Sequence, residues 1–288
     1  MTQALNDLTN ILTLKQIDLF TFSGSGSIND GAQATFGGHF LGQATAAAYA
    51  TVRSDFVIHS LHGYFLSGGV PRQPIFYQVE NLRDGRTFCS RQVTAHQAGK
   101  EKFRLTASFT IPEHGKSFDA VAPKQFEQLP KPESIEPYHE LMARQNPHPL
   151  PEEWALREHG VDVRVVHAPW ADAGLSENMG ICMWIKANGN VAVNPRLHSA
   201  MMAYQSDESI ADNILLPFGL TWGSPDLLFV SLDHALWFHQ QIDLNEWHFV
   251  EQAPVVVANG RGLATAKVWS QEKKLVVSFT QEVLIREA

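Results

Sequence analysis

Cysteine is scarce in this sequence. Only Cys89 and Cys182 occur among the 288 residues, and no Cys-x-x-Cys pair is present. Such pairs are typical of zinc sites and redox centres, so their absence argues against both. We expect two ordinary buried thiols in a reducing compartment, with a single disulfide or one reactive thiol as the alternatives.

Positive charge and long apolar runs are also limited. The chain has 22 basic and 30 acidic residues, a formal net charge of −8, and no cluster of Lys and Arg. A non-specific grip on nucleic acid needs such a cluster, so we expect no nucleic-acid partner. No segment approaches the roughly 20 apolar residues of a membrane span. The start lacks the basic region of a signal peptide and the end, LIREA, is not a peroxisomal signal, so we predict a cytoplasmic protein.

The chain contains enough apolar material for a sizeable core. Hydrophobic residues make up 44% of it and charged residues 18%, which is typical of a folded globular protein. Eight of the 15 prolines lie within residues 112–151, and so much proline excludes a central strand or a long helix there. We expect only short helical turns near 138–145 and 151–158. The predicted units are an N-terminal domain over 1–112, a proline-rich linker over 113–159 and a C-terminal domain over 160–288.

The two halves end in similar sequences. Both contain Gly-Arg at a turn, Gly85-Arg86 and Gly260-Arg261, and both finish with Ser-Phe-Thr, at 108–110 and 278–280. Asp84-Gly85 and Asn259-Gly260 are typical of two-residue type I′ hairpin turns. We infer that the chain contains a duplicated unit.

Each half combines one helical segment with several apolar strands. Residues 36–52 are rich in Ala and begin with two glycines, whereas 194–209 place Pro195 at a favourable first helical position. The expected strands are 55–66, 74–82, 87–96, 102–111, 226–238, 247–257, 262–269 and 274–285. This order predicts an α+β fold, a tandem (double) hot-dog in which two antiparallel sheets, each wrapping a long helix, lie side by side.

One predicted strand is unusually polar for its position. SLDHALWFH (231–239) combines an apolar pattern with a hydroxyl, a carboxylate and two imidazoles. Strict alternation places Ser231 and Asp233 on the same face as Trp237, and His234 on the other. We expect Ser231 to face a reaction site and Asp233 to bond neighbouring strands.

Seven motifs, in order along nearly the full chain, resemble the type II acyl-CoA thioesterase family. They are FGGHFLGQA (36–44), HSLHGYFLSGG (59–69), LRDGRTFCSRQV (82–93), YQSD (204–207), SLDHALWFH (231–239), LNEW (244–247) and SFTQE (278–282). The resemblance implies hydrolysis of fatty acyl-CoA to free fatty acid and CoA, in a double hot-dog fold without a metal. It also implies a catalytic Asp, Thr or Ser, and Gln at the positions of Asp207, Ser231 and Gln281. The family more often has Thr where this chain has Ser231.

Those three residue types suit attack by an activated water. A carboxylate buried in apolar surroundings becomes more basic, so Asp207 can accept a proton near neutral pH. The amide of Gln281 can both donate and accept hydrogen bonds, and the hydroxyl of Ser231 can link the other two groups. No covalent intermediate on the enzyme is needed.

Further polar residues are assigned supporting roles. Backbone N–H groups at the start of the first helix, near Gly38, are expected to stabilise the oxyanion. Arg83, Arg86 and Arg91 are candidates for binding the phosphates of CoA. His62 is a secondary polar candidate beside the apolar channel that we expect to hold the acyl chain. His pairs without Cys or carboxylate ligands at close spacing do not predict a metal, and we expect no cofactor.

Two other functions stay open, and both keep the same fold. One is a non-catalytic acyl-CoA-binding hot-dog protein, and the other is a hot-dog enoyl-CoA hydratase. No GxSxG, P-loop or GxGxxG motif supports other enzyme classes. Hot-dog units extend their sheets by pairing edges, so we expect a homo-oligomer.

Overall fold

The computed structural model describes residues 2–26, 34–145, 158–166, 180–220, 224 and 226–287. Within them the helices are α1 (Gln3–Leu12), α2 (Gly37–Ala50), α3 (Tyr138–Gln145) and α5 (Pro195–Gln205), with short 3-10 helices η1 (Lys124–Gln128), η2 (Pro132–Ser134), η3 (Ala211–Ile214) and η4 (Leu216–Phe218). The strands of the first half are β1 (Lys15–Asp18), β2 (Thr21–Gly24), β3 (Val57–Phe65), β4 (Ile75–Asp84), β5 (Phe88–Gln97) and β6 (Lys100–Thr110). Those of the second half are β7 (Val161–Val165), β8 (Cys182–Ala187), β9 (Leu227–Phe238), β10 (His248–Ala258), β11 (Arg261–Ser270) and β12 (Leu275–Glu287).

These strands form one continuous antiparallel sheet. Its order is β1-β2-β4-β5-β6-β3-β9-β12-β11-β10-β8-β7. Read outward from the centre, β3-β6-β5-β4-β2-β1 and β9-β12-β11-β10-β8-β7 follow the same plan, and α2 and α5 precede the corresponding strands β3 and β9. The predicted tandem hot-dog is confirmed, with β3 pairing β9 to join the two sheets. The exact domain boundaries stay a prediction.

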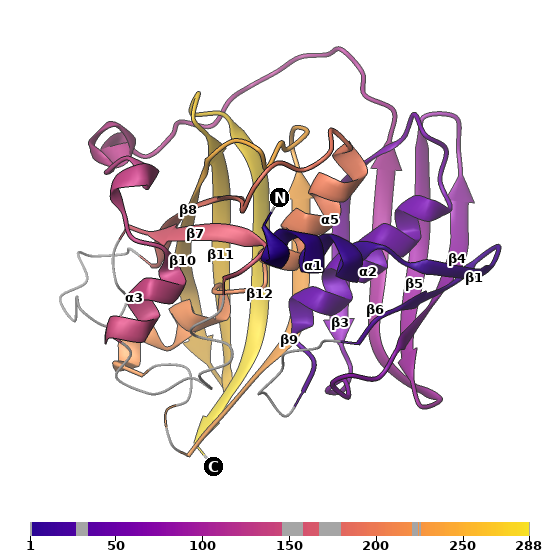
Figure 1. Ribbon diagram of the computed structural model, residues 1–288, viewed down its shortest axis with the longest axis horizontal. Helices are drawn as coiled ribbons and strands as arrows, with labels where there is room; N and C mark the ends of the chain where they lie inside the picture. Colours follow the sequence, from indigo (N-terminus) through magenta and orange to yellow (C-terminus); the bar gives the residue numbers. More distant parts are fainter. Residues whose placement is uncertain are drawn as a thin grey trace.

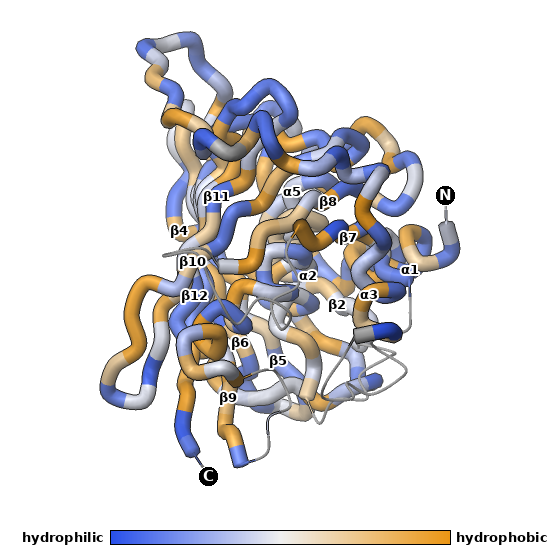
Figure 2. The backbone as a smooth tube through the Cα atoms, turned by 90° about the vertical axis from the view of Figure 1, so that its left-hand side faces the viewer, coloured by the Kyte–Doolittle hydropathy of each residue, from blue (hydrophilic) through white to orange (hydrophobic). Residues whose placement is uncertain are grey.

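Helices α1, α2 and α5 cover one face of this sheet near its middle (Figures 1 and 2). The predicted helix over 36–52 is α2, and it is buried on almost every side because α5 and the sheet enclose it. The predicted start of α5 is also confirmed: Pro195 is its first residue, and the side chain of Asn194 accepts the Arg196 N–H at 3.1 Å. The helix ends at Gln205, earlier than predicted, so Asp207 lies two residues beyond its last residue.

The strands alternate between hydrophobic and hydrophilic residues (Figure 2). Strand β5, for example, buries every second side chain along its whole length. This period of two places one row of each strand against the helices and the other row on the outer face. All eight predicted strands are present, with bounds shifted by a few residues.

The hairpin turns were predicted correctly in one half only. Asn259 and Gly260 have φ of 52° and 71°, as a two-residue type I′ turn requires. The prediction at Asp84-Gly85 is wrong, because β5 starts at Phe88 and the Gly85 N–H donates to the Phe88 carbonyl across a longer loop. A second turn of the I′ kind, at Ala98 (φ 50°) and Gly99 (φ 72°), had no Asn or Asp to reveal it.

The proline-rich linker runs from the end of β6 across the second half of the molecule to α3 (Figure 1). The indole N–H of Trp184 donates to the Pro130 carbonyl at 3.2 Å, and the ring of Phe126 lies 5.6 Å from that of Phe249. The linker therefore covers a small aromatic cluster on β8, β10 and β11. The predicted turn near 138–145 is α3, whereas most of the one near 151–158 lies outside the described residues.

The cysteines and the apolar helices can now be compared with the expectations from the sequence. Cys89 and Cys182 are both free and buried, which confirms the prediction of ordinary thiols. No helix among the described residues is long and apolar enough to cross a membrane.

Candidate active site

The site begins where the start of α2 meets the end of α5. The backbone N–H of Gly38 donates to Oδ2 of Asp207 at 2.7 Å. Helix α2 has no side-chain cap of its own at Phe36, so the carboxylate of Asp207 satisfies one of its free N–H groups. The positive end of the helix dipole stabilises a negative charge at this position.

Two glycines allow this close approach. A Cβ atom at Gly38 would lie 2.2 Å from the carbonyl oxygen of Tyr204, and one at Gly37 would lie 2.6 Å from Oδ2 of Asp207. Real Cβ atoms do not approach other atoms so closely, so a side chain at either position would force its neighbour to move. The first contact is with backbone and the second is with a side chain, which makes Gly38 the stricter requirement.

Gln281 brings the predicted residues together. It lies on β12, is buried, and its Nε2 donates to the hydroxyl of Ser231 on β9 at 2.7 Å. Its side chain also hydrogen-bonds to Asp207 and thereby favours the ionised form of that carboxylate. Asp207, Ser231 and Gln281 are therefore joined in one hydrogen-bonded group, and their catalytic roles stay a prediction.

Ser231 reaches this group because of a β-bulge. Asp233 pairs with Glu282 and Ser231 pairs with Val283, so β9 contains one more residue than β12 at this point. The extra residue, Leu232, reverses the alternation and turns Ser231 toward the helices. Strict alternation had placed Ser231 on the face of Asp233 and Trp237, and that part of the prediction is wrong.

Asp207 has the electrostatic properties of a general base. The side chain is buried, and desolvation raises its pKa from the usual 3.8 to about 7. Hydrogen bonds from Gly38 and Gln281 oppose this rise, whereas the nearby charge of Glu208 adds to it. The other carboxylate oxygen, Oδ1, is buried and accepts no hydrogen bond from the described residues.

His234 also belongs to the site, although no role there was predicted for it from the sequence. Its Nδ1 lies 2.6 Å from Oε1 of Gln281, and its Nε2 lies 2.9 Å from the hydroxyl of Ser206. Burial lowers the pKa of this imidazole to about 4, so it is neutral at physiological pH. Its position three residues after Ser231 was the available signal, but only the pairing of β9 with β12 shows which partner it meets.

Two residues near the centre of the sheet face away from the site. His62 is exposed, and its ring lies edge-on to that of Trp237 at 5.1 Å on the outer face. The prediction that His62 lines a channel beside the site is therefore wrong. Asp233 accepts the backbone N–H of Glu282 at 3.1 Å, which confirms its predicted role between strands.

Arg91 is not available to bind a phosphate. Its side chain is 4% exposed, forms an ion pair with Asp84 at 2.8 Å, and donates to the Thr51 carbonyl at the end of α2. These contacts make it a structural residue, contrary to our prediction. Arg83 and Arg86 are exposed on the adjacent hairpin. This hairpin lies by the far end of α2, roughly 20 Å from Gly38 at 1.5 Å per helical residue.

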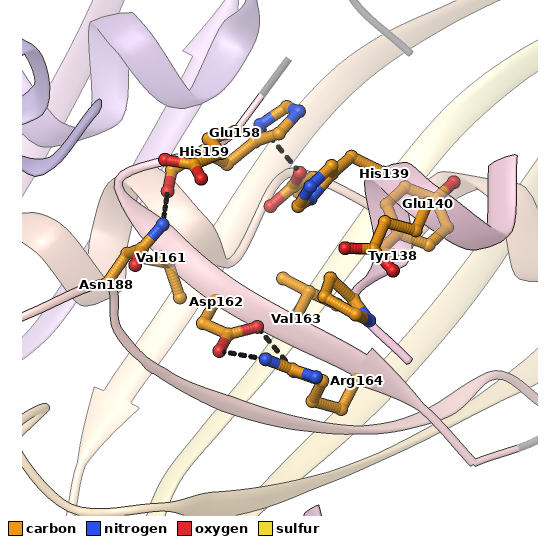
Figure 3. A pocket seen from close by; sticks show the side chains of 12 residues that line it. Tyr138, His139, Glu140, Glu158, His159, Val161, Asp162, Val163, Arg164 and Asn188 are labelled. Carbon is orange, nitrogen blue, oxygen red and sulfur yellow. Dashed lines mark hydrogen bonds and ion pairs between the residues drawn. The ribbon is translucent and has the colours of Figure 1, made fainter. Parts of the chain in front are cut away.

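A cavity of about 120 Å³ lies apart from these residues, between α3 and β7 (Figure 3). None of the predicted site residues lines it. Within it, Nδ1 of His159 lies 3.3 Å from Oε1 of Glu208, and Arg164 pairs with Asp162 at 2.7 Å. Its connection to the site is Glu208, which directly follows Asp207. No group of three or more His, Cys, Asp or Glu suited to a metal was found among the described residues.

The opposite ends of α2 and α5 meet in a different way. There, the guanidinium of Arg196, in the first turn of α5, donates to the carbonyls of Tyr49 and Val52 at the end of α2. It also lies over the ring of Tyr49, at 5.2 Å from its centroid. An arginine therefore occupies the position that corresponds, in the duplicated fold, to the pairing of Gly38 with Asp207.

Comparison with known proteins identifies the family of this chain. The family model for acyl-CoA thioesterase matches residues 162–284, and that for the acyl-CoA thioesterase N-terminal domain matches residues 25–110. The chain is 32% identical to acyl-CoA thioesterase 2 of Haemophilus influenzae, over 99% of each protein. Among solved structures it is similar to acyl-CoA thioesterase II of Mycobacterium marinum (29% identity, TM-score 0.78, 98% of each chain). A hot dog fold protein of Alicyclobacillus acidocaldarius (17% identity, TM-score 0.76, 100% of each chain) supports the fold alone. The chain therefore belongs to the acyl-CoA thioesterase family.

Proposed function

We propose that this chain hydrolyses fatty acyl-CoA to free fatty acid and CoA by direct attack of a water held by Asp207, Ser231 and Gln281. Membership of the family makes the chain an acyl-CoA thioester hydrolase. The observation that carries the proposed mechanism is the buried Oδ1 of Asp207, which has no hydrogen-bond partner among the described residues and lies in the group formed with Gln281 and Ser231.

The reaction follows from these positions. Oδ1 of Asp207 accepts a proton from the water while the water oxygen attacks the thioester carbon. The tetrahedral intermediate then breaks its C–S bond, and the proton held by Asp207 passes to the departing CoA sulfur. Gln281 and Ser231 fix the direction of attack, since both can hydrogen-bond to the same water.

In this mechanism Gly38 orients the base and does not stabilise the oxyanion, which was the role expected from the sequence. Its N–H already donates to Oδ2 of Asp207, so it holds the carboxylate in place. An oxyanion role for the same N–H would require that bond to open. We therefore assign Gly38 to orienting the base.

The alternatives fit the site less well. An acyl-CoA-binding protein gains nothing from a buried carboxylate with a raised pKa, because desolvating a charge costs free energy. A hydratase adds water across a double bond, and the family assignment gives no support for that reaction.

The test is release of free thiol from acyl-CoA substrates of increasing chain length. We expect Gln281→Ala to lower kcat about a hundredfold and Ser231→Ala about tenfold, because each removes one group that orients the water. Ser231→Thr, which keeps the hydroxyl, should stay within about threefold of wild type. Ser278→Ala is the matched control, since Ser278 lies on the same strand as Gln281 but bonds to His239 on the outer face. Absence of thiol release from every substrate would favour the binding protein, and unchanged rates in both Ala variants would remove the site assignment.

Arg83 and Arg86 remain the proposed contacts for the phosphates of CoA. Both are exposed and lie within four residues of each other on the β4–β5 hairpin. A double Ala variant should raise KM for acyl-CoA about threefold or more without lowering kcat, because the loss is in substrate binding and not in chemistry. An unchanged KM at low ionic strength would contradict this assignment.

We further propose a cytoplasmic location and association of copies through their sheets. The outer face and edges carry exposed apolar residues, including Ile17 on β1 and Tyr64 on β3, with 52% and 60% exposure. Burying such surface favours association. Light scattering of the purified protein would measure the number of chains.

A further inference from the structure

We propose that His234 is a positioning residue, which holds the carbonyl oxygen of Gln281 so that the amide NH₂ group faces Ser231 and Asp207. This inference rests on the proposed function, in which Gln281 orients the attacking water. It concerns a residue that touches neither the water nor the substrate in that mechanism.

The amide of Gln281 has two orientations of almost the same shape. They differ by half a turn, which exchanges the carbonyl oxygen with the NH₂ group. In one of them NH₂ donates toward Ser231 and Asp207, and in the other the carbonyl oxygen faces the carboxylate and repels it. The contact of 2.6 Å between Oε1 and Nδ1 of His234 selects the first orientation.

This selection requires the proton of the neutral imidazole to be on Nδ1. A carbonyl oxygen can only accept a hydrogen bond, so Nδ1 must be the donor. Nε2 then lacks a proton and must accept the single hydroxyl proton of Ser206, 2.9 Å away, in place of the Ala203 carbonyl, which lies at the same distance from that hydroxyl. The lowered pKa of His234 agrees with a ring that carries one proton only.

The surroundings of His234 fix the ring as well as its proton. The imidazole is 1% exposed and stacks on the ring of Phe279, with centroids 5.8 Å apart and planes at 21°. Ser206, its second partner, directly precedes Asp207. The contacts Ser206–His234–Gln281–Asp207 therefore form a closed ring that ties the end of α5 to β9 and β12.

The test uses variants that separate the two nitrogens of the ring. His234→Phe keeps the ring shape without either nitrogen, and we expect kcat to fall about thirtyfold with KM within twofold. In His234→Asn the side-chain NH₂ lies near the place of Nδ1, so it should recover kcat to within about fivefold of wild type. His234→Gln places its amide nearer Nε2 and should not recover it.

A double variant decides whether His234 acts through Gln281. We expect His234→Phe to cost less than twofold when added to Gln281→Ala, because the group it positions is already absent. His239→Phe is the matched control, since His239 bonds Ser278 at 2.8 Å across the same pair of strands on the other face, and its kcat should be unchanged.

Equal losses with and without Gln281 would overturn the inference. Equal rates for His234→Asn and His234→Gln would also overturn it, and this comparison holds even if His234→Phe does not fold. A Gln281→Ala variant with full activity would instead refute the proposed site, so the two failures can be told apart.

Discussion

Replacing Asp207 by Asn is expected to lower kcat for acyl-CoA hydrolysis about a thousandfold while making the folded protein more stable at pH 8. Asn cannot accept the proton of the attacking water, and loss of a general base typically costs two to four orders of magnitude, about 10² to 10⁴. The rise in stability has a separate cause: Asn removes the desolvated charge. Free-thiol release and thermal unfolding of the same preparations measure both effects.

The expected dependence on pH follows from the direction of the pKa change. The pKa of Asp207 rises from 3.8 to about 7 on folding, so between these values the folded state binds more protons than the unfolded state. This contribution to stability is present at low pH and is lost as pH rises toward 7. The Asn variant should gain nothing near pH 4 and about 4 kcal/mol above pH 7. In wild type, kcat/KM should rise with pH to a plateau above about 7.

Asp212 provides the matched control for this prediction. Desolvation and the charges of Glu208 and Asp207 raise its pKa to about 7 as well, but it is not in the hydrogen-bonded group. Asp212→Asn should therefore increase stability at high pH and keep kcat within about threefold of wild type. If the Asp207→Asn variant kept the rise of kcat/KM with pH, the general base would be another residue.

The second large effect is expected for Gly38→Ala, which should destabilise the protein by about 3 kcal/mol and abolish activity. The new methyl group would lie 2.2 Å from the carbonyl oxygen of Tyr204, so α2 and α5 must separate. Their separation would also break the bond from the Gly38 N–H to Asp207. Chemical denaturation and thiol release measure the two losses.

Two other glycines sharpen this test. Gly115 has no atom within 4 Å of the place of a Cβ, so Gly115→Ala should leave stability unchanged. At Gly37 the nearest contacts are the side chains of Asp207 and Phe65, which can shift. Gly37→Ala should therefore reduce activity more than it reduces stability. Equal stability of the Gly38 and Gly115 variants would show that the two helices are not in close contact.

The long elements, and the meeting of Asp207, Ser231 and Gln281 at one place, could be predicted from the sequence. The strands of the two hairpin-rich regions have a clear period of two, and α2 and α5 have strong local signals in their small residues and in Pro195. The short strands β1, β2, β7 and β8 were missed, because four to six residues carry little periodicity of their own.

Other features could not be predicted because they depend on partners from distant segments. The bulge at Leu232 exists only in the pairing of β9 with β12, so alternation within one strand could not place Ser231. The sequence around Arg91 suggested a phosphate ligand, because its partners Thr51 and Asp84 can be recognised only from the folded structure. The role of His234 could not be predicted either, because its partners Gln281 and Ser206 lie on other elements.

Arg196, in the first turn of α5, gives the two junctions between α2 and α5 different chemistry. Two identical units related by a twofold axis would hold two equivalent reaction centres. Here Arg196 bonds to the helix-end carbonyls at one of them, so that location now serves as a structural joint. The first half still contributes Gly38 to the junction with Asp207, so the two halves share a plan but differ in the polar groups that join their helices.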